Sequence, residues 1–120
     1  RWAEQGPDII ERLAQRNRQS AHPTITVSTR PVPYPLFGAI APWNFPVILS
    51  TVDLVPALMA GCAGLVKPSE VTPRFVAPLR ETIEAVPELA AVLAFVEGGP
   101  ETGQALIEQV DYLCFTGSVP

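Results

Sequence analysis

The sequence contains few residues of the types that most often bind metals or form disulfides. Its 120 residues include two cysteines and one histidine. Cys62 and Cys114 lie far apart inside apolar runs, where buried free thiols are more common than a disulfide, and they do not set the spacing of a metal site. His22 precedes Pro23 in a polar stretch, which is typical of a surface histidine. We therefore predict no bound metal.

Basic residues are also scarce. Eight lysines and arginines stand against twelve aspartates and glutamates, which gives a formal net charge of −4. A nucleic-acid surface needs clustered Lys and Arg. The one such cluster, formed by Arg12, Arg16 and Arg18, shares a predicted helix with acidic residues, so a solvated face of mixed charge is the better interpretation. We predict no nucleic-acid partner.

Long apolar runs are absent. No run reaches the roughly 18 residues that a membrane span needs, and no charged and then apolar leader opens the chain. With 48% hydrophobic residues, the composition favours a globular α/β or all-α interior over disorder. We therefore predict a soluble, cytoplasmic protein without a membrane partner. Because the chain begins without methionine and stops at "FTGSVP", we also expect a piece of a longer protein.

The first 30 residues predict a short helix and a strand. Ile9, Ile10 and Leu13 recur at helical spacing, and the helix is expected from Pro7 to about Gln19. The segment "TITVSTR" (24–30) alternates apolar and polar residues, which is typical of a half-buried strand. The prolines of "PVPYP" end it.

The remainder, residues 31–120, alternates apolar runs with helical segments. Strands are predicted at "LFGAIA" (36–41), "CAGLVK" (62–67), "VLAFVEGG" (92–99) and "DYLCF" (111–115). Helices are predicted over 45–61 and over 100–109. A further helix is predicted to begin after an N-cap at Thr72. One face of this helix is formed by Phe75, Val76, Leu79, Ile83 and Val86. This order predicts an α/β fold: a truncated, Rossmann-like parallel sheet with flanking helices, preceded by the short helix and strand. Ligands of such sheets bind at the carboxyl ends of the strands.

The stretch "APWNFPV" (41–47) follows the first of these strands and encloses one amide. Because each proline disfavours the α region for the residue before it, Ala41 and Phe45 are expected to be extended. Asn44 offers a neutral N–H donor to a carbonyl oxygen that develops negative charge. The alternative is that Asn44 closes a turn.

The exits of the other three strands also carry candidate binding residues. In "KPSE" (67–70), Lys67 and Glu70 can grip a ribose diol or form a surface ion pair. The glycine-rich "VEGGPETG" (96–103) suits a pyrophosphate close to backbone amides, or forms a plain turn, and it does not match G-x-G-x-x-G. In "FTGS" (115–118), Thr116 and Ser118 are small donors or part of a capped turn.

The stretches "APWNFPV", "PALMAGCAGLVKPSEVTP", "VEGGPETGQAL" and "DYLCFTGS" occur in order. As a set they resemble the aldehyde dehydrogenase superfamily, specifically the front part of its cofactor-binding domain, over roughly residues 31–118. The resemblance implies an NAD(P)-dependent oxidation of an aldehyde to a carboxylic acid. In that family a cysteine thiolate attacks the aldehyde, hydride passes to nicotinamide, and water activated by a glutamate releases the acid.

The resemblance also implies roles for individual residues. Asn44 would be the oxyanion donor. The implied cofactor-binding residues are Ala41, Pro42, Trp43, Lys67, Ser69, Glu70, Gly99, Gly103, Thr116, Gly117 and Ser118. Residues 1–30 would belong to a bridging or oligomerisation region of a homo-oligomer, and residues 31–120 would be a partial dinucleotide-binding domain.

Two departures from the family pattern limit this reading. Cys62 stands where the family usually has asparagine, and we interpret both Cys62 and Cys114 as strand residues rather than the nucleophile. The nucleophile and the base glutamate would lie downstream of Pro120, so the chain is expected to be inactive alone. Two alternatives stay open: a non-catalytic nucleotide-binding or interaction module, and a reductase of acyl-phosphates or acyl-CoA. Glu70 should repel a 2′-phosphate, which favours NAD over NADP, although Lys67 could offset it.

Overall fold

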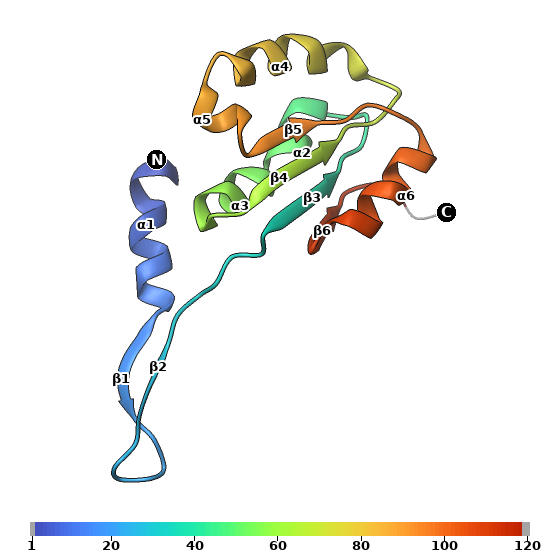
Figure 1. Cartoon of the computed structure of the whole chain (residues 1–120). Helices are drawn as coiled ribbons and strands as arrows, with labels where there is room; N and C mark the ends of the chain where they lie inside the picture. Colours follow the sequence, from blue (N-terminus) through green and yellow to red (C-terminus); the bar gives the residue numbers. More distant parts are fainter. Residues whose placement is uncertain (1, 119–120) are drawn as a thin grey trace.

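The structure, a computed structural model, describes residues 2–118. It contains an N-terminal helix and hairpin, followed by a parallel sheet with helices on both faces (Figure 1). The first part consists of α1 (Trp2–Leu13), β1 (Gln15–Gln19) and β2 (Thr26–Thr29). The sheet strands are β3 (Leu36–Ile40), β4 (Ala63–Lys67), β5 (Leu93–Phe95) and β6 (Tyr112–Phe115). The helices between them are α2 (Pro46–Thr51), α3 (Leu54–Ala60), η1 (Pro73–Phe75), α4 (Val76–Glu84), α5 (Pro87–Ala90) and α6 (Pro100–Gln109).

The four-stranded sheet has the order β5-β4-β3-β6, and every neighbouring pair is parallel. The chain moves outward from β3 through β4 to β5, and then returns past both to place β6 beside β3. This is the 3-2-1-4 order of the first half of a doubly wound sheet, whose direction reverses between β3 and β6. The predicted α/β fold with a Rossmann-like parallel sheet is confirmed.

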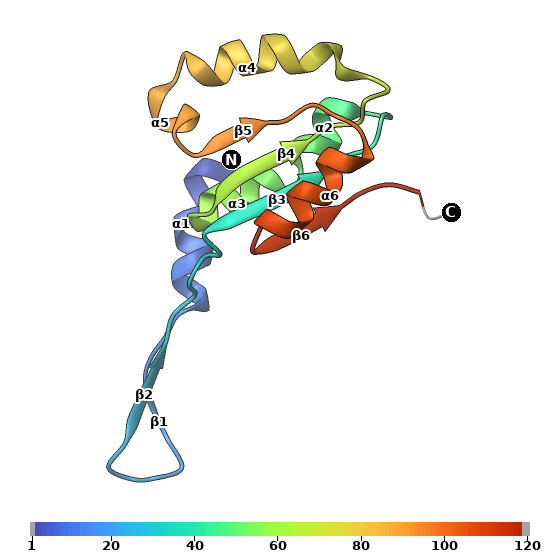
Figure 2. The ribbon, with the colours of Figure 1, turned by 45° about the vertical axis from the view of Figure 1, so that its right-hand side comes forward.

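Alternate residues of β3 and β4 face different helices. The main core lies on the side of α3 and α4, where Phe37, Ala39, Val66, Leu54 and Val76 pack together. On the other side, a Cβ at Gly38 would lie 2.8 Å from Leu106 of α6, so the glycine lets this helix approach closely. Figure 2 shows α6 in front of the sheet and α3 behind it. Burial of both faces explains why these strands are nearly continuous apolar runs.

The N-terminal prediction is correct in part. The helix begins at Trp2 rather than at Pro7, which lies inside it, and ends at Leu13 rather than near Gln19. Residues 15–19 form β1, which pairs antiparallel with β2. Residues 15–19 are all polar, so no apolar face continues the helix, and Asn17 has a φ of 52°, which lies outside the helical region. The strand at 26–29 is present, but it is exposed on both faces rather than half-buried, because the hairpin projects away from the sheet (Figures 1 and 2).

Two predicted helices are interrupted. The helix expected over 45–61 is divided into α2 and α3. Pro56 has no N–H to donate to the Val52 carbonyl, so the helix restarts with Pro56 in a first turn, where proline is tolerated. The helix after Thr72 begins as the short η1 and ends at Glu84, so Val86 lies outside it and is 45% exposed. The helix at 100–109 and the strand at 112–115 agree with the prediction.

Candidate functional site

The loops after β3, β4 and β6 meet at the carboxyl end of the sheet. They surround a cavity of about 630 Å³. The candidate residues that line it are Ala41, Pro42, Trp43, Asn44, Lys67, Ser69, Glu70, Thr116, Gly117 and Ser118. The strand order reverses between β3 and β6, and ligands of such sheets bind in the crevice at this point, outside the carboxyl ends of the strands. The topology therefore brings together residues up to 77 positions apart, from Ala41 to Ser118.

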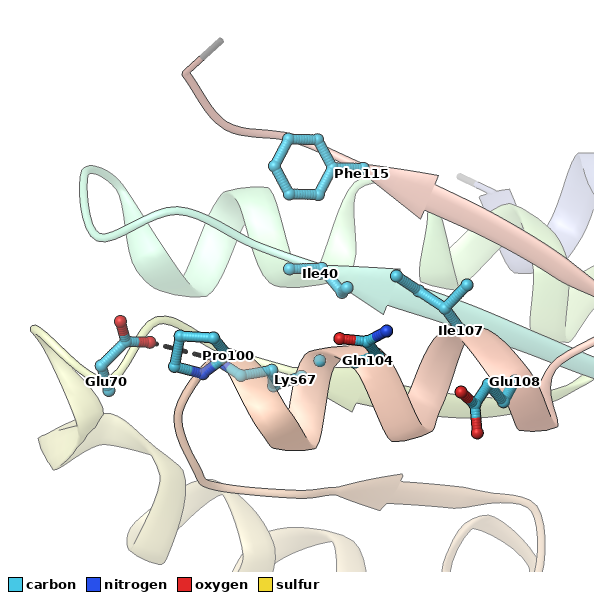
Figure 3. A pocket seen from close by; sticks show the side chains of 9 residues that line it. Ile40, Lys67, Glu70, Pro100, Gln104, Ile107, Glu108 and Phe115 are labelled. Carbon is cyan, nitrogen blue, oxygen red and sulfur yellow. Dashed lines mark hydrogen bonds and ion pairs between the residues drawn. The ribbon is translucent and has the colours of Figure 1, made fainter. Parts of the chain in front are cut away.

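A second cavity of about 550 Å³ lies against α6. It shares Ile40, Lys67, Glu70 and Phe115 with the first, so the two are continuous along the edge of the sheet. Its other lining residues are Pro100, Gly103, Gln104, Ile107 and Glu108. Figure 3 shows it between α6 and the ends of β3 and β6.

Lys67, the last residue of β4, lies where the two cavities meet. Its side chain runs under α6 and is buried, with 4% of the residue exposed. The ammonium Nζ donates to the carbonyl oxygen of Pro68 and to Oε2 of Glu70, each at 3.1 Å (Figure 3). Gly103 makes room for it, since a Cβ there would lie 3.5 Å from Lys67 Cδ. Buried charges need such partners, and this pair holds the ammonium in a fixed place.

Glu70 is the exposed partner of this pair. A hydrogen bond from its own backbone N–H, and then the hydrogen bond and charge of Lys67, lower the pKa of its carboxyl group. The group is therefore ionised at neutral pH and free to accept hydrogen bonds from hydroxyl groups with its remaining lone pairs. Because this pKa is lower than in the unfolded chain, any stabilisation by the pair is present above the unfolded pKa. It is lost as the pH falls through the folded one.

The loop that carries Asn44 is anchored at both ends. Its first residue, Ala41, donates its N–H to the carbonyl of Lys67 at 3.1 Å, and the carbonyl of Phe45 accepts from Leu49 at 3.0 Å, which starts α2. Phe45 is not extended as expected: its φ of 48° and ψ of 50° are left-handed. The chain must turn sharply at this residue to enter the helix, and the left-handed conformation provides that turn.

The two remaining glycine candidates differ in position. Gly103 lines the cavity against α6, whereas Gly99 lines neither cavity. The N–H of Gly99 donates to Oε1 of Glu101 at 3.1 Å, so a carboxylate of the same helix already occupies this N-terminus. The predicted approach of a pyrophosphate to this turn remains a prediction.

Several residues of the site were not anticipated. Pro100, Gln104, Ile107 and Glu108 lie at helical spacing along one face of α6, and this periodicity could have indicated them. Thr72, expected to cap a helix, makes no side-chain cap. Its hydroxyl donates to the carbonyl oxygen of Trp43 at 3.0 Å.

The structure also describes the state of both cysteines. Both cysteines are free, with Cys62 buried. Desolvation, and then the charge of Asp53, raise the pKa of Cys114.

Within residues 2–118 no cluster of three or more His, Cys, Asp or Glu side chains could hold a metal ion. No helix in that part of the chain is both long and apolar enough to cross a membrane.

The strand order, with paired cavities at the reversal point, defines an α/β domain of the Rossmann-like class. The model of the aldehyde dehydrogenase family matches residues 3–120. The chain belongs to this family.

Individual relatives agree with this assignment. N-succinylglutamate 5-semialdehyde dehydrogenase 2 of Caulobacter vibrioides is 46% identical over 84 residues, which cover 69% of this chain and 17% of that protein. A putative aldehyde dehydrogenase PutA from Anabaena variabilis has a solved structure that is 53% identical with a TM-score of 0.89, covering 98% of this chain and 24% of that one. The NAD+ complex of an aldehyde dehydrogenase from Bacillus cereus is 33% identical with a TM-score of 0.77, covering 98% and 23%. The chain thus spans less than a quarter of these relatives.

Proposed function

We propose that this chain is the front part of the cofactor-binding domain of an NAD-dependent aldehyde dehydrogenase, which oxidises an aldehyde to a carboxylic acid. The observation that carries the proposal is the convergence of Asn44 and the Lys67–Glu70 pair on one continuous pair of cavities. The Lys67–Glu70 pair would bind the cofactor, and the Asn44 amide would act on the reacting carbonyl. The NAD+ complex of the Bacillus cereus relative supports the choice of cofactor.

The residues present fit an adenosine dinucleotide. The buried ammonium of Lys67 and the ionised Glu70 would hold the adenosine ribose, with Ser69 nearby, because one donates to its hydroxyls and the other accepts from them. The adenine would lie in the cavity against α6, between the apolar side chains of Ile107 and Phe115. The loops at 41–44 and 116–118 would line the path toward the reacting end.

NAD would accept the hydride removed from the substrate carbon. The chain's own contribution at the reacting end is Asn44, whose side-chain N–H would donate to the substrate oxygen as negative charge develops on it. A fixed neutral donor of this kind contributes most in the transition state, because it needs no reorganisation.

Neither cysteine of this chain would be the nucleophile. Cys62 precedes the first residue of β4, at the end of the sheet opposite Lys67, and it is buried. Cys114 lies within β6, and its raised pKa disfavours the thiolate. We therefore propose that the nucleophile and the base belong to other segments of a longer protein.

Titration of NAD into the isolated chain tests the binding half of this proposal. We expect saturable heat in calorimetry and quenching of tryptophan fluorescence, because Trp43 lines the cavity. Lys67→Met should abolish both signals, while Arg74→Met, an exposed basic residue outside both cavities, should leave them unchanged. A folded chain that gives no saturable signal at millimolar NAD would support the interaction module instead.

We further propose that the β1–β2 hairpin contacts a second copy of the chain, as part of an assembly region over residues 1–30. Both strands are exposed throughout, and an isolated two-stranded hairpin is marginally stable. Residues 15–30 contain no acidic residue and three arginines, of which Arg16 already pairs with Glu11 of α1 at 2.6 Å, while the whole chain has a net charge of −4. The other two are Arg18 and Arg30. This contrast favours a contact between the hairpin and an acidic surface of another copy.

Sedimentation velocity tests the assembly. We expect self-association that weakens with added salt, and Arg18→Glu should weaken it about tenfold because it reverses a charge in the contact. Arg74→Glu makes the same change in charge outside the hairpin and should have little effect. A single monomeric species at every concentration would contradict the proposal.

A further inference from the structure

The middle of the Asn44 loop is tied to the loop that follows β4. The hydroxyl of Thr72 donates to the carbonyl oxygen of Trp43 at 3.0 Å, a bond that joins residues 29 positions apart. Trp43 directly precedes Asn44, so this bond fixes the peptide from which the Asn44 side chain extends. The ends of the loop are held separately, by the bond from Ala41 to β4 and by the first turn of α2.

The loop adopts a conformation that its own side chains do not explain. Phe45 is left-handed, with a φ of 48°, and such a conformation persists in a residue other than glycine only where its surroundings impose it. Packing of the neighbouring rings does not impose it, since Trp43 is 60% and Phe45 72% exposed. The restraints on this turn are therefore two hydrogen bonds to backbone carbonyls, one from the Thr72 hydroxyl to Trp43 and one from the Leu49 N–H to Phe45.

We propose that Thr72 is a positioning residue for Asn44. Its hydroxyl holds the Trp43 carbonyl, which keeps Phe45 in the left-handed region and directs the Asn44 amide into the cavity shared with Lys67. Thr72 itself does not line that cavity, so it acts through the backbone rather than on a ligand. The catalytic consequence rests on the proposed function of Asn44, whereas the restraint on the loop does not.

The restraint can be measured on the complete 120-residue chain. Thr72→Val keeps the shape of the side chain and removes the donor, and Thr72→Ser keeps the donor. In the valine variant we expect the NMR couplings that report φ of Phe45 to leave their left-handed values, and the Asn44 side-chain amide signals to broaden or shift. The serine variant should retain the wild-type values. Unchanged amide signals from α6, on the other face of the sheet, will show that the fold is intact.

Wild-type couplings at Phe45 in a folded valine variant would overturn the proposal. If the valine variant unfolds, Thr72→Ala and Thr72→Ser provide the comparison. If Phe45 loses its left-handed couplings in Thr72→Ala but keeps them in Thr72→Ser, the restraint is supported. Equal Phe45 couplings in the two variants contradict it.

Kinetics test the catalytic consequence in a chimera in which these 120 residues replace the matching segment of the Anabaena variabilis relative. Thr72→Val should lower kcat about tenfold and leave KM for NAD within about twofold, since a small misplacement affects the reacting geometry rather than cofactor binding. Thr72→Ser should restore kcat to within about twofold of the unsubstituted chimera. An unchanged kcat, or a fall in kcat matched by serine, would overturn this consequence. An inactive unsubstituted chimera would contradict the proposed function, while the couplings would still decide the restraint.

Discussion

Replacing Asn44 with alanine in this chimera should lower kcat by about 100-fold to 1,000-fold. This is the range found when one donor to an oxyanion is removed. The side chain lines the larger cavity, and its loop is held at both ends and in the middle by hydrogen bonds. Because the donor would act only as charge develops, KM for NAD and the calorimetric affinity of the isolated chain for NAD should change by less than about twofold.

Asn44→Asp separates this role from that of a turn residue. Aspartate supports turns about as well as asparagine, so a structural role predicts nearly full activity. A carboxylate cannot donate the hydrogen bond at neutral pH and adds a negative charge beside the developing one. The oxyanion role therefore predicts a loss of kcat at least as large as in Asn44→Ala. Substantial activity of the aspartate variant would contradict the assignment.

The parts of the fold that could be predicted are those whose signals are local. Buried parallel strands are short apolar runs, so β3, β4 and β6 lie where the runs are, and α6 begins at its proline. The hairpin could not be found in this way. Residues 15–19 are all polar, and their strand conformation comes from pairing with residues 26–29 rather than from a face that packs on a core.

The candidate site likewise contains features that local sequence signals predict and features that they do not. The convergence of the Asn44 loop with Lys67 and Glu70 was predictable, because carboxyl ends of parallel strands meet at one edge. The Lys67–Glu70 pair itself spans three residues. Thr72 gave no such signal, because its hydroxyl reaches a carbonyl 29 residues away. Such a bond depends on the assembled fold.

The left-handed turn at Phe45 shows why a correct local rule can give a wrong result. Proline disfavours the α region for the residue before it, and this was the reason to expect an extended Phe45. The rule excludes one conformation but does not choose among the others. The need to begin α2 at Pro46 while Trp43 stays tied to Thr72 makes the choice, and both constraints come from tertiary structure.

Glu70→Gln should change the preference between the two nicotinamide cofactors by about thirtyfold. The substitution keeps the size of the side chain and removes its charge. Hydrogen bonds to a charged acceptor contribute about 1.5–3 kcal/mol, so affinity for NAD should fall as the bonds to the ribose weaken. Affinity for NADP should rise, because Lys67 remains at the same place and no carboxylate repels the 2′-phosphate. Calorimetric titration of both cofactors into the chain gives the two affinities directly.

Glu108→Gln is the matched control for this prediction, because Glu108 lines the same cavity and the change in charge is identical. Its effect on the ratio of affinities should stay within about twofold, because the proposed position of the ribose lies at Lys67 and Glu70. The pH dependence gives a second measure. Since the pKa of Glu70 is lowered, NAD affinity of the wild-type chain should stay constant as the pH falls from 8 to the ordinary range of a glutamate and decrease only below it, when the carboxylate is protonated. An equal ratio of NAD to NADP affinity in wild type and Glu70→Gln would show that other residues select the cofactor. If Glu108→Gln changed this ratio as much as Glu70→Gln does, the effect would come from the overall charge of the cavity.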